Sequence, residues 1–440
     1  MYVIVKGKSM EKVRLMLLLC FVLNYYSIIS GVNCTLGEGT NYPVPGGNGD
    51  VSIAISPDGS FLVISRQNTV LVASKPIVTF RIVKDELQDR SEYTLPSGII
   101  QTNGVCISPD GDLLAIPSVR GVSLFKITDY KLHDGIFYPV FNQTRSSTSL
   151  GSSSAASFSP DGSLLATTGC LGDASLALLS VTNGTLKKEG LYPFSIGGCF
   201  ALAFSPNGKM IVVTPMLIED SISVYTVNNN TLINATKSKL PNGAQSTSSP
   251  LFSPDGSLFA TAGGADIGGI NVFNVVNGTL TNGINYPLPL PDIYNTGIAF
   301  SPDGSMLASA NGLSNDNDIT LFNVQDGALV DGRNYLMPPG AENPTSLTFS
   351  PDGKLLIIAN QDSDFITVVP VKCTDSSHDA GSKLGMYIGI GIGAGACCCG
   401  IFCLMNVVMT GSIIILYKKG ISLRSFTSLF NARSGYQPVN

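Results

Sequence analysis

The chain has 440 residues, of which only 13% are charged, and its formal net charge is −5. This length exceeds one ordinary domain, and the 47 glycines and 25 prolines suit many short strands and turns. No basic block lies outside the two ends, which argues against nucleic acid as a partner, and no Walker motif or phosphate-binding glycine loop points to a nucleotide cofactor.

Residues 1–31 have the pattern of a secretory signal peptide. Basic residues precede the apolar run from Leu15 to Val22, and the small residues Ser30 and Gly31 follow it. Met10 is an alternative start that would give a more usual signal length. The competing interpretation is a signal anchor that stays in the membrane.

One stretch, Phe252 to Gly263, is one of seven copies that differ by small changes. Each copy reads as a strand, a tight turn and a second strand, because proline fixes φ, aspartate favours the next turn position and glycine accepts a positive φ. A period of roughly 40–50 residues with this core is typical of a β-propeller, so we predict an all-β, seven-bladed propeller over residues 32–373. The turn prolines are Pro57, Pro109, Pro160, Pro206, Pro254, Pro302 and Pro351.

Each repeat continues with two further strands, and a recurring tyrosine marks the outermost one. In the sixth repeat, Ile319–Val324 is the third strand, and Leu329 and Tyr335 lie on the fourth. The seventh repeat has no room for a fourth strand, but Leu36 and Tyr42 show the same six-residue spacing near the N-terminus. We therefore predict four-stranded blades, the last completed by residues 39–45, which closes the ring and removes an exposed sheet edge.

The Ser-Pro-Asp-Gly turns and third strands such as Ile319–Val324 resemble those of WD-repeat-like and YVTN/lactonase-type seven-bladed propellers. The resemblance covers residues 35–371, but the Trp-Asp ending of true WD repeats is absent. Such families include lactone hydrolases and many non-enzymatic binding modules. The motif is therefore specific for the fold and weak for the function.

The pattern of titratable residues argues against histidine or metal chemistry. His133 is expected at a rim and His378 in a stalk, so neither reaches a central pocket. Acidic residues gather in loops of one face and are candidates for contacting a cationic ligand, the alternative being that they only keep the face soluble. These ligand-face candidates are Asp220, Asp266, Asp316, Asp318, Asp362 and Asp364. No catalytic residue and no metal site are predicted; the run from Asn315 to Asp318 lacks the EF-hand spacing.

Six sequons are candidates for N-glycosylation: Asn33, Asn142, Asn183, Asn229, Asn234 and Asn277. Three of them, Asn183, Asn229 and Asn277, align at the tip of the hairpin between the third and fourth strands. They indicate either a glycosylated surface or simply the asparagine that suits a tight hairpin turn.

Four of the ten cysteines are candidates for two disulfides. Cys34 and Cys373 align with the two turn residues of that hairpin, so a bridge between them would replace the missing turn of the last blade. Cys170 and Cys199 are expected on one face of neighbouring blades and form the second candidate pair. Either bridge requires an oxidising compartment. Cys106 is expected to be a buried free thiol.

Beyond a stalk at residues 374–383, the segment 384–417 contains no charged residue and is long enough to span a bilayer as one helix. Gly385, Gly389 and Gly393 are spaced for close helix pairing, although a glycine-rich helix without a partner explains them equally well. Because the tail 418–440 is basic, the positive-inside rule predicts a cytoplasmic tail. In the tail, Tyr436 and Val439 fit the Tyr-x-x-apolar sorting signal.

These features predict a single-pass type I membrane protein whose propeller is extracellular or lumenal. We expect a non-enzymatic binding, adhesion or receptor module for a protein or other extracellular ligand. The alternative is a membrane-tethered, lactonase-like hydrolase that uses acidic loop residues.

Overall fold

The computed structural model describes residues 33–44, 51–66, 77–96, 104–118, 120–141, 155–169, 175–193, 199–215, 220–241, 244, 247–263, 268–289, 297–312 and 318–374. Residues Thr35–Lys372 form one compact unit. The second unit, Met1–Cys34 with Cys373–Asn440, lies almost wholly outside the described residues. Among the described residues there is no helix long and apolar enough to cross a membrane, and the predicted signal, span and tail lie outside them.

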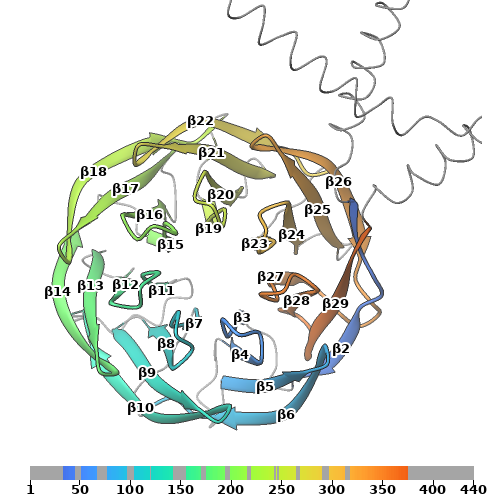
Figure 1. Ribbon diagram of the computed structural model, residues 1–440, viewed down its shortest axis with the longest axis horizontal. Coiled ribbons are helices and arrows are strands. Elements are labelled where there is room, and N and C mark those ends of the chain that lie inside the picture. Colours follow the sequence, from blue (N-terminus) through green and yellow to red (C-terminus); the bar gives the residue numbers. More distant parts are fainter. Residues whose placement is uncertain are drawn as a thin grey trace, which may run out of the picture. The chain divides into compact units, whose positions relative to one another are not determined.

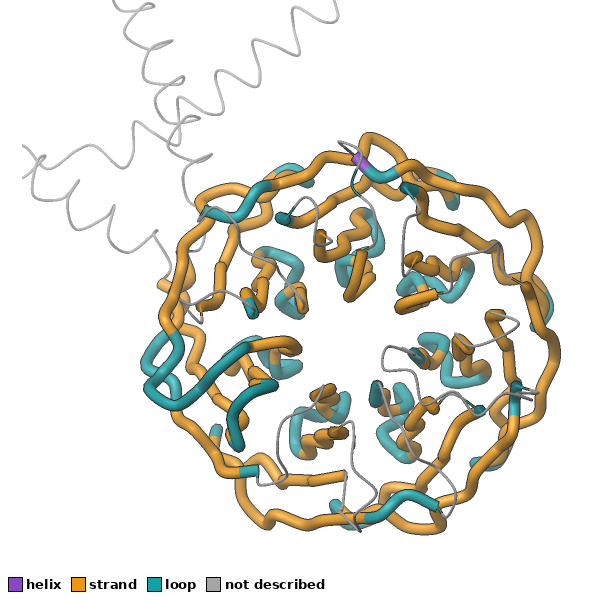
Figure 2. Tube along the Cα trace, turned by 180° about the vertical axis from the view of Figure 1, so that it is seen from behind, coloured by secondary structure: helices purple, strands orange, loops and turns teal. Residues whose placement is uncertain are grey.

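Seven antiparallel sheets stand around a common axis and form a ring, as predicted (Figure 1). Each sheet is a blade with strand a innermost and strand d outermost (Figure 1), and in blades one to six strands a to d follow in chain order. The view from behind shows the same ring (Figure 2). Blades one to three are β3 (Val51–Ile55), β4 (Phe61–Arg66), β5 (Ile77–Val83), β6 (Glu86–Tyr93); β7 (Cys106–Ile107), β8 (Leu113–Ser118), β9 (Gly121–Thr128), β10 (Lys131–Pro139); and β11 (Ala156–Phe158), β12 (Leu164–Gly169), β13 (Ser175–Thr182), β14 (Thr185–Pro193).

Blades four to seven follow the same plan. Their strands are β15 (Cys199–Phe204), β16 (Met210–Pro215), β17 (Ser221–Asn228), β18 (Thr231–Lys239); β19 (Thr247–Phe252), β20 (Leu258–Gly263), β21 (Ile270–Val276), β22 (Thr279–Tyr286); β23 (Gly297–Phe300), β24 (Met306–Asn311), β25 (Asp318–Gln325), β26 (Ala328–Leu336); and β27 (Pro344–Phe349), β28 (Leu355–Asn360), β29 (Phe365–Thr374) with β1 (Asn33–Leu36) and β2 (Thr40–Pro43).

The N-terminal segment completes blade seven. Strand β2 pairs antiparallel with the start of β29, and Tyr42 stands opposite Ile366. Strand β1 pairs with the same strand further along, so β1 and β2 together make strand d. A disulfide joins Cys34 and Cys373, the bridge expected from the sequence. The prediction of ring closure by an N-terminal strand is therefore confirmed.

The apolar core lies between neighbouring blades, because the b and c strands bury both faces. Between blades seven and one, Ile357 and Val368 pack with Leu62 and Val78, and Tyr42 packs against them. The tyrosines of strand d are partly buried in such clusters, as expected for packing between blades. Tyr192 also accepts a hydrogen bond across blades, from the backbone N–H of Leu232, at 2.9 Å.

The repeat turn connects neighbouring blades as well as strands a and b. In blade three, Ser159 Oγ donates to Asp161 at 2.6 Å and accepts the N–H of Leu164 at 2.9 Å. Each turn glycine has positive φ and lies against the turn proline of the preceding blade. A Cβ on Gly59 would lie 3.2 Å from Cδ of Pro351, so this chain of contacts also closes between blades one and seven.

A β-bulge in the outer strand of the blades was not predicted. In blade six, Phe322 of strand c has no single partner on strand d and stands opposite both Asp331 and Gly332. Asp331 has φ of +53°, and a Cβ on Gly332 would lie 2.5 Å from the Phe322 ring. Blades two and five repeat this with Gly135 on Phe125 and Gly283 on Phe273. The bulge bends and disrupts the outer edge strand, which discourages pairing with another chain.

Candidate functional site

A polar surface whose loops are joined by several contacts lies on the face formed by the b–c and d–a loops, where blades seven and one meet. The Arg66 guanidinium, at the end of β4, lies 3.8 Å from Asp364 in the b–c loop of blade seven. Its side chain is only 6% exposed, whereas that of Asp364 is 57% exposed. Burial lowers the pKa of Arg66 and the Asp364 carboxylate opposes that shift, so the arginine stays charged at neutral pH.

A second set of contacts ties the d–a loop before blade seven to the same b–c loop. The side-chain amide of Asn343 donates to Asp362 at 2.9 Å, and the N–H of Gln361 donates to the Asn343 carbonyl at 2.8 Å. Asn343 is buried with φ of +54°. Beside it, the exposed Glu342 donates its N–H to the Ser363 hydroxyl at 3.4 Å. We call Glu342, Asp362 and Asp364 the acidic patch: three exposed carboxylates on loops that hydrogen bonds hold in place.

Asp318 was expected on this face, but the structure corrects this. It is fully buried and accepts a hydrogen bond from Asn311 at 2.8 Å. The same asparagine donates to Thr320, which donates to Asn334 on strand d, also within 2.8 Å. A carboxylate in such a network orders the interior of blade six and is not available to a ligand.

The remaining ligand-face candidates do not join the acidic patch. Asp220 is exposed on blade four, where it pairs with Lys239 at 3.5 Å. Asp266 and Asp316 lie outside the described residues. In the part of the chain that the structure describes, no group of three or more His, Cys, Asp or Glu side chains is placed to hold a metal ion. His133 lies exposed on β10, at the rim where it was expected.

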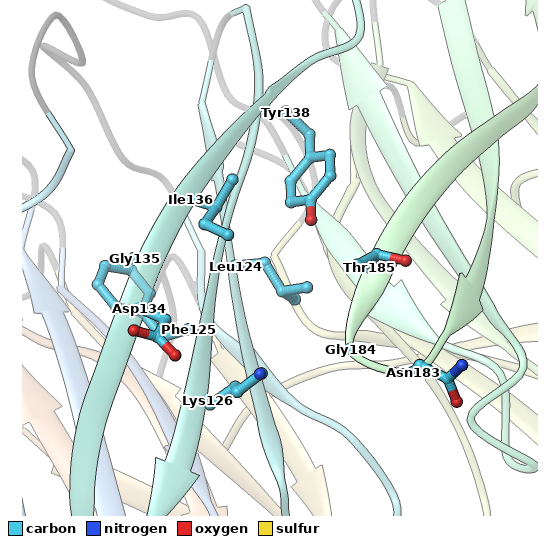
Figure 3. A pocket seen from close by; sticks show the side chains of 10 residues that line it. All are labelled: Leu124, Phe125, Lys126, Asp134, Gly135, Ile136, Tyr138, Asn183, Gly184 and Thr185. Atoms are coloured by element: carbon cyan, nitrogen blue, oxygen red, sulfur yellow. The ribbon is translucent and has the colours of Figure 1, made fainter.

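A groove of about 270 Å³ lies on the rim between blades two and three (Figure 3). Strands β9 and β10 supply Leu124, Ile136 and Tyr138, and the hairpin tip of blade three supplies Asn183 and Thr185. Lys126 and Asp134 add one charge of each sign. The groove is therefore amphipathic.

The sequons fall on turns and bulges. Asn183, Asn229 and Asn277 occupy hairpin tips with φ between +46° and +50°, which agrees with their predicted alignment. The sequon threonines Thr185, Thr231 and Thr279 each donate to the carbonyl three residues earlier, at 2.6–2.7 Å. Asn234 lies at the bulge of β18 and Asn33 begins β1, whereas Asn142 lies outside the described residues.

Among the described cysteines outside the disulfide, Cys106 has a thiol of low reactivity. Cys106 is a free thiol on β7, partly buried, and desolvation raises its pKa to about 12, which keeps it protonated. Cys199 begins β15, but Cys170 lies outside the described residues, so their pairing stays a prediction.

Residues 197–379 match the family model described as Lactonase, 7-bladed beta-propeller. This chain carries a seven-bladed propeller with lactonase-like repeats. The search of curated proteins finds no match.

The solved structures that share the fold include these two. The β-propeller domain of Cps50 (Swd1) from Myceliophteria thermophila is 15% identical with a TM-score of 0.57, over 78% of this chain and 100% of that one. Hydrazine synthase from Kuenenia stuttgartiensis is 18% identical with a TM-score of 0.54, over 75% of this chain and 97% of that one. At such identities the likeness concerns the fold alone.

Proposed function

We propose that this chain is a membrane-anchored propeller that works as a binding module outside the cytoplasm, with the acidic patch as its contact surface for a basic protein. The observation that carries the proposal is the patch itself. Asp362 and Asp364 are exposed while Asn343 and Arg66 beneath them are buried and fix the loops. Because these carboxylates are preorganised by their loops, they lose little conformational entropy when a partner binds, which favours a role in recognition.

Two features support the location. The Cys34–Cys373 disulfide persists only in an oxidising compartment. The uncharged segment 384–417, followed by Lys418 and Lys419, supplies the membrane anchor and its orientation by the positive-inside rule. Because β29 is a strand c, the chain leaves the propeller from the face of the Ser-Pro-Asp-Gly turns. The acidic patch, on the opposite face, then points away from the membrane.

The test uses the purified full chain in detergent micelles, with a fluorescent nonalysine peptide as the cationic probe and nonaglutamate as its counterpart. Binding of nonalysine is expected to weaken several-fold in Asp362→Asn/Asp364→Asn and to fall as salt rises. Asp255→Asn/Asp303→Asn is the matched control. It removes the same charge from the opposite face, at turns where blade four already has Asn207. Equal weakening in both variants contradicts the proposal.

The alternative is a membrane-tethered, lactonase-like hydrolase that uses acidic loop residues. The family match over residues 197–379 supports a propeller with lactonase-like repeats and does not by itself favour this hydrolase. A panel of lactones, with and without added divalent metal, separates the two functions. Our proposal expects turnover no greater than in membranes without the protein. Turnover that Asp364→Asn abolishes, with Asp303→Asn unaffected, would favour the hydrolase.

Two proposals concern the residues beyond the propeller. We expect Gly385, Gly389 and Gly393 to bring two spans together, so that replacing all three by leucine lowers crosslinking between copies in membranes. Unchanged crosslinking speaks against the pairing.

We also expect Tyr436 and Val439 to act as a sorting signal, and Tyr436→Ala to raise the surface level by slowing uptake. An unchanged uptake rate removes that role.

A further inference from the structure

The groove between blades two and three has a wall suited to a sugar ring. Ile136 on β10 is 51% exposed. Covering such an aliphatic side chain would remove apolar surface from water, which is favourable in free energy. Tyr138 and Leu124 extend this apolar wall, and Tyr138 directs its hydroxyl toward Thr185 across the groove (Figure 3). Aromatic and aliphatic groups with a few polar groups at their edge match the apolar face and the hydroxyls of a pyranose.

The groove also contains its own attachment point for a sugar. Asn183, Gly184 and Thr185 form a complete sequon, and all three residues line the groove. Asn183 is exposed at the hairpin tip, and its side chain points away from the other side chains that line the groove (Figure 3). An exposed asparagine moves among staggered rotamers, and Gly184 has no side chain to block a sugar that folds back toward Tyr138.

We propose that Asn183 carries an N-linked glycan and that this groove seats its first N-acetylglucosamine. The inference rests on the proposed location outside the cytoplasm, since the modification occurs only there. The sugar would cover Ile136 and Tyr138, and Lys126 and Asp134 would hydrogen-bond its polar groups. Blade five exposes Ile284 at the corresponding position to 52%, so the sequon beside Ile136 is what distinguishes this groove.

The aligned sequon at Asn277 is a matched control, because its turn is the same and its surroundings differ. Asn183 and Asn277 have φ of +49° and +50°, and Thr185 and Thr279 make the same 2.7 Å hydrogen bond. A Cβ on Gly184 would lie 3.3 Å from Lys126 and 3.7 Å from Leu113, whereas one on Gly278 would have nothing within 4 Å. The tip at Asn183 therefore packs on its neighbour, and the tip at Asn277 projects into open space.

The experiment measures how fast peptide N-glycosidase removes each glycan from the folded full chain. This enzyme cuts the bond between asparagine and the first sugar, so a seated sugar resists it. The full chain is made in cells that attach high-mannose glycans, and site-resolved mass spectrometry follows release at Asn183 and Asn277. We expect release at Asn183 to be at least tenfold slower in the folded protein and equal after denaturation. Equal rates in the folded protein, or an unmodified Asn183, overturn the proposal.

Tyr138→Ser copies the serine that blade four has at the corresponding Ser238. It is expected to bring release at Asn183 close to the rate at Asn277; an unchanged rate contradicts the groove as the seat. Thr185→Ser keeps the sequon and the hydroxyl, and is expected to preserve slow release. If other sequons are modified and Asn183 is not, only this inference fails. If none of the sequons is modified, the proposed location fails with it.

Discussion

The Ser-Pro-Asp-Gly turn combines two tasks in four residues. Serine and aspartate stabilise the turn through their side chains. The glycine has no side chain, so the turn can lie against the turn proline of the preceding blade. At Gly59 a Cβ would meet Pro351 at 3.2 Å, which is tighter than the ordinary contact at the other six turns. The seam between the first and last blades is therefore the place where a larger residue is tolerated least.

Gly59→Ala is expected to destabilise the propeller more than Gly278→Ala. Both glycines have a positive φ, +73° at Gly59 and +75° at Gly278, so both variants lose about 1–2 kcal/mol from the left-handed backbone. Only Gly59→Ala adds the contact with Pro351. Urea unfolding of the full chain, followed by circular dichroism, measures the difference; equal losses would show that the proline contact is not tight.

The turn aspartates make the fold sensitive to acid. Hydrogen bonds from Lys354 and from Ser350 lower the pKa of Asp352 to about 2. A carboxyl group whose pKa is lower in the folded state stabilises it above the unfolded pKa of about 3.9, and this stabilisation is lost as pH falls from about 4 towards 2. Asp352→Asn introduces the residue type that blade four has at the corresponding Asn207. This variant is expected to lose less unfolding free energy than wild type over that pH interval. Parallel pH curves for the two proteins would contradict this.

At the scale of the strand, the outer bulge is held by a glycine lying on an aromatic ring. Gly332→Ala is expected to cost about 1–3 kcal/mol, because its Cβ would overlap Phe322. Adding Phe322→Leu, the residue type that blade three has as Leu179, should recover part of the loss. A double-mutant cycle of unfolding free energies measures this coupling, and additive losses would refute the contact.

The closing strand depends on side chains as well as on the disulfide. Thr367 donates to Asn41 at 2.7 Å and accepts from Asn360 at 3.0 Å, which repeats the arrangement of Asn311, Thr320 and Asn334 in blade six. Asn41 also donates to the Pro339 carbonyl at 3.1 Å. The N-terminal strand thus makes the same contacts as a strand d that follows its blade in the chain.

Cys34→Ser/Cys373→Ser is expected to lower the unfolding free energy by about 2–5 kcal/mol, since the bridge closes a loop with a sequence separation of 339 residues. Reduction of the wild type should produce at least this loss, because it opens the Cys34–Cys373 bridge and also the predicted Cys170–Cys199 bridge. Non-reducing urea unfolding of both proteins tests this. A variant as stable as wild type would mean that the strand contacts alone close the ring.

The sequence revealed those features that repeat in the chain and missed those that depend on contacts between blades. Blade number and the closing strand followed from the spacing of Pro57 to Pro351 and of Leu36 to Tyr42. The bulge was missed although Asp134-Gly135, Asn282-Gly283 and Asp331-Gly332 stand at one aligned position. The burial of Asp318 was missed because the sequence of one strand does not show that Asn311 of the neighbouring strand donates a hydrogen bond to this carboxylate.

At the scale of the whole molecule, we propose that the disulfide-closed propeller is attached to a membrane anchor. The disulfide joins Cys34 and Cys373, next to which the predicted signal ends and the predicted stalk begins. In the proposed topology, the acidic patch and the rim groove lie on the side of the membrane away from the basic tail. Both the binding and the glycan proposals depend on this arrangement.

The most direct test is the topology of the full chain in cells, with an epitope tag after Asn440 and an antibody against the propeller. The tag is expected to react once digitonin opens the plasma membrane. The propeller is expected to react on intact cells if it is extracellular, or only after full detergent if it is lumenal. A tag that reacts on intact cells, or a propeller that first reacts together with the tag after digitonin, would contradict the account.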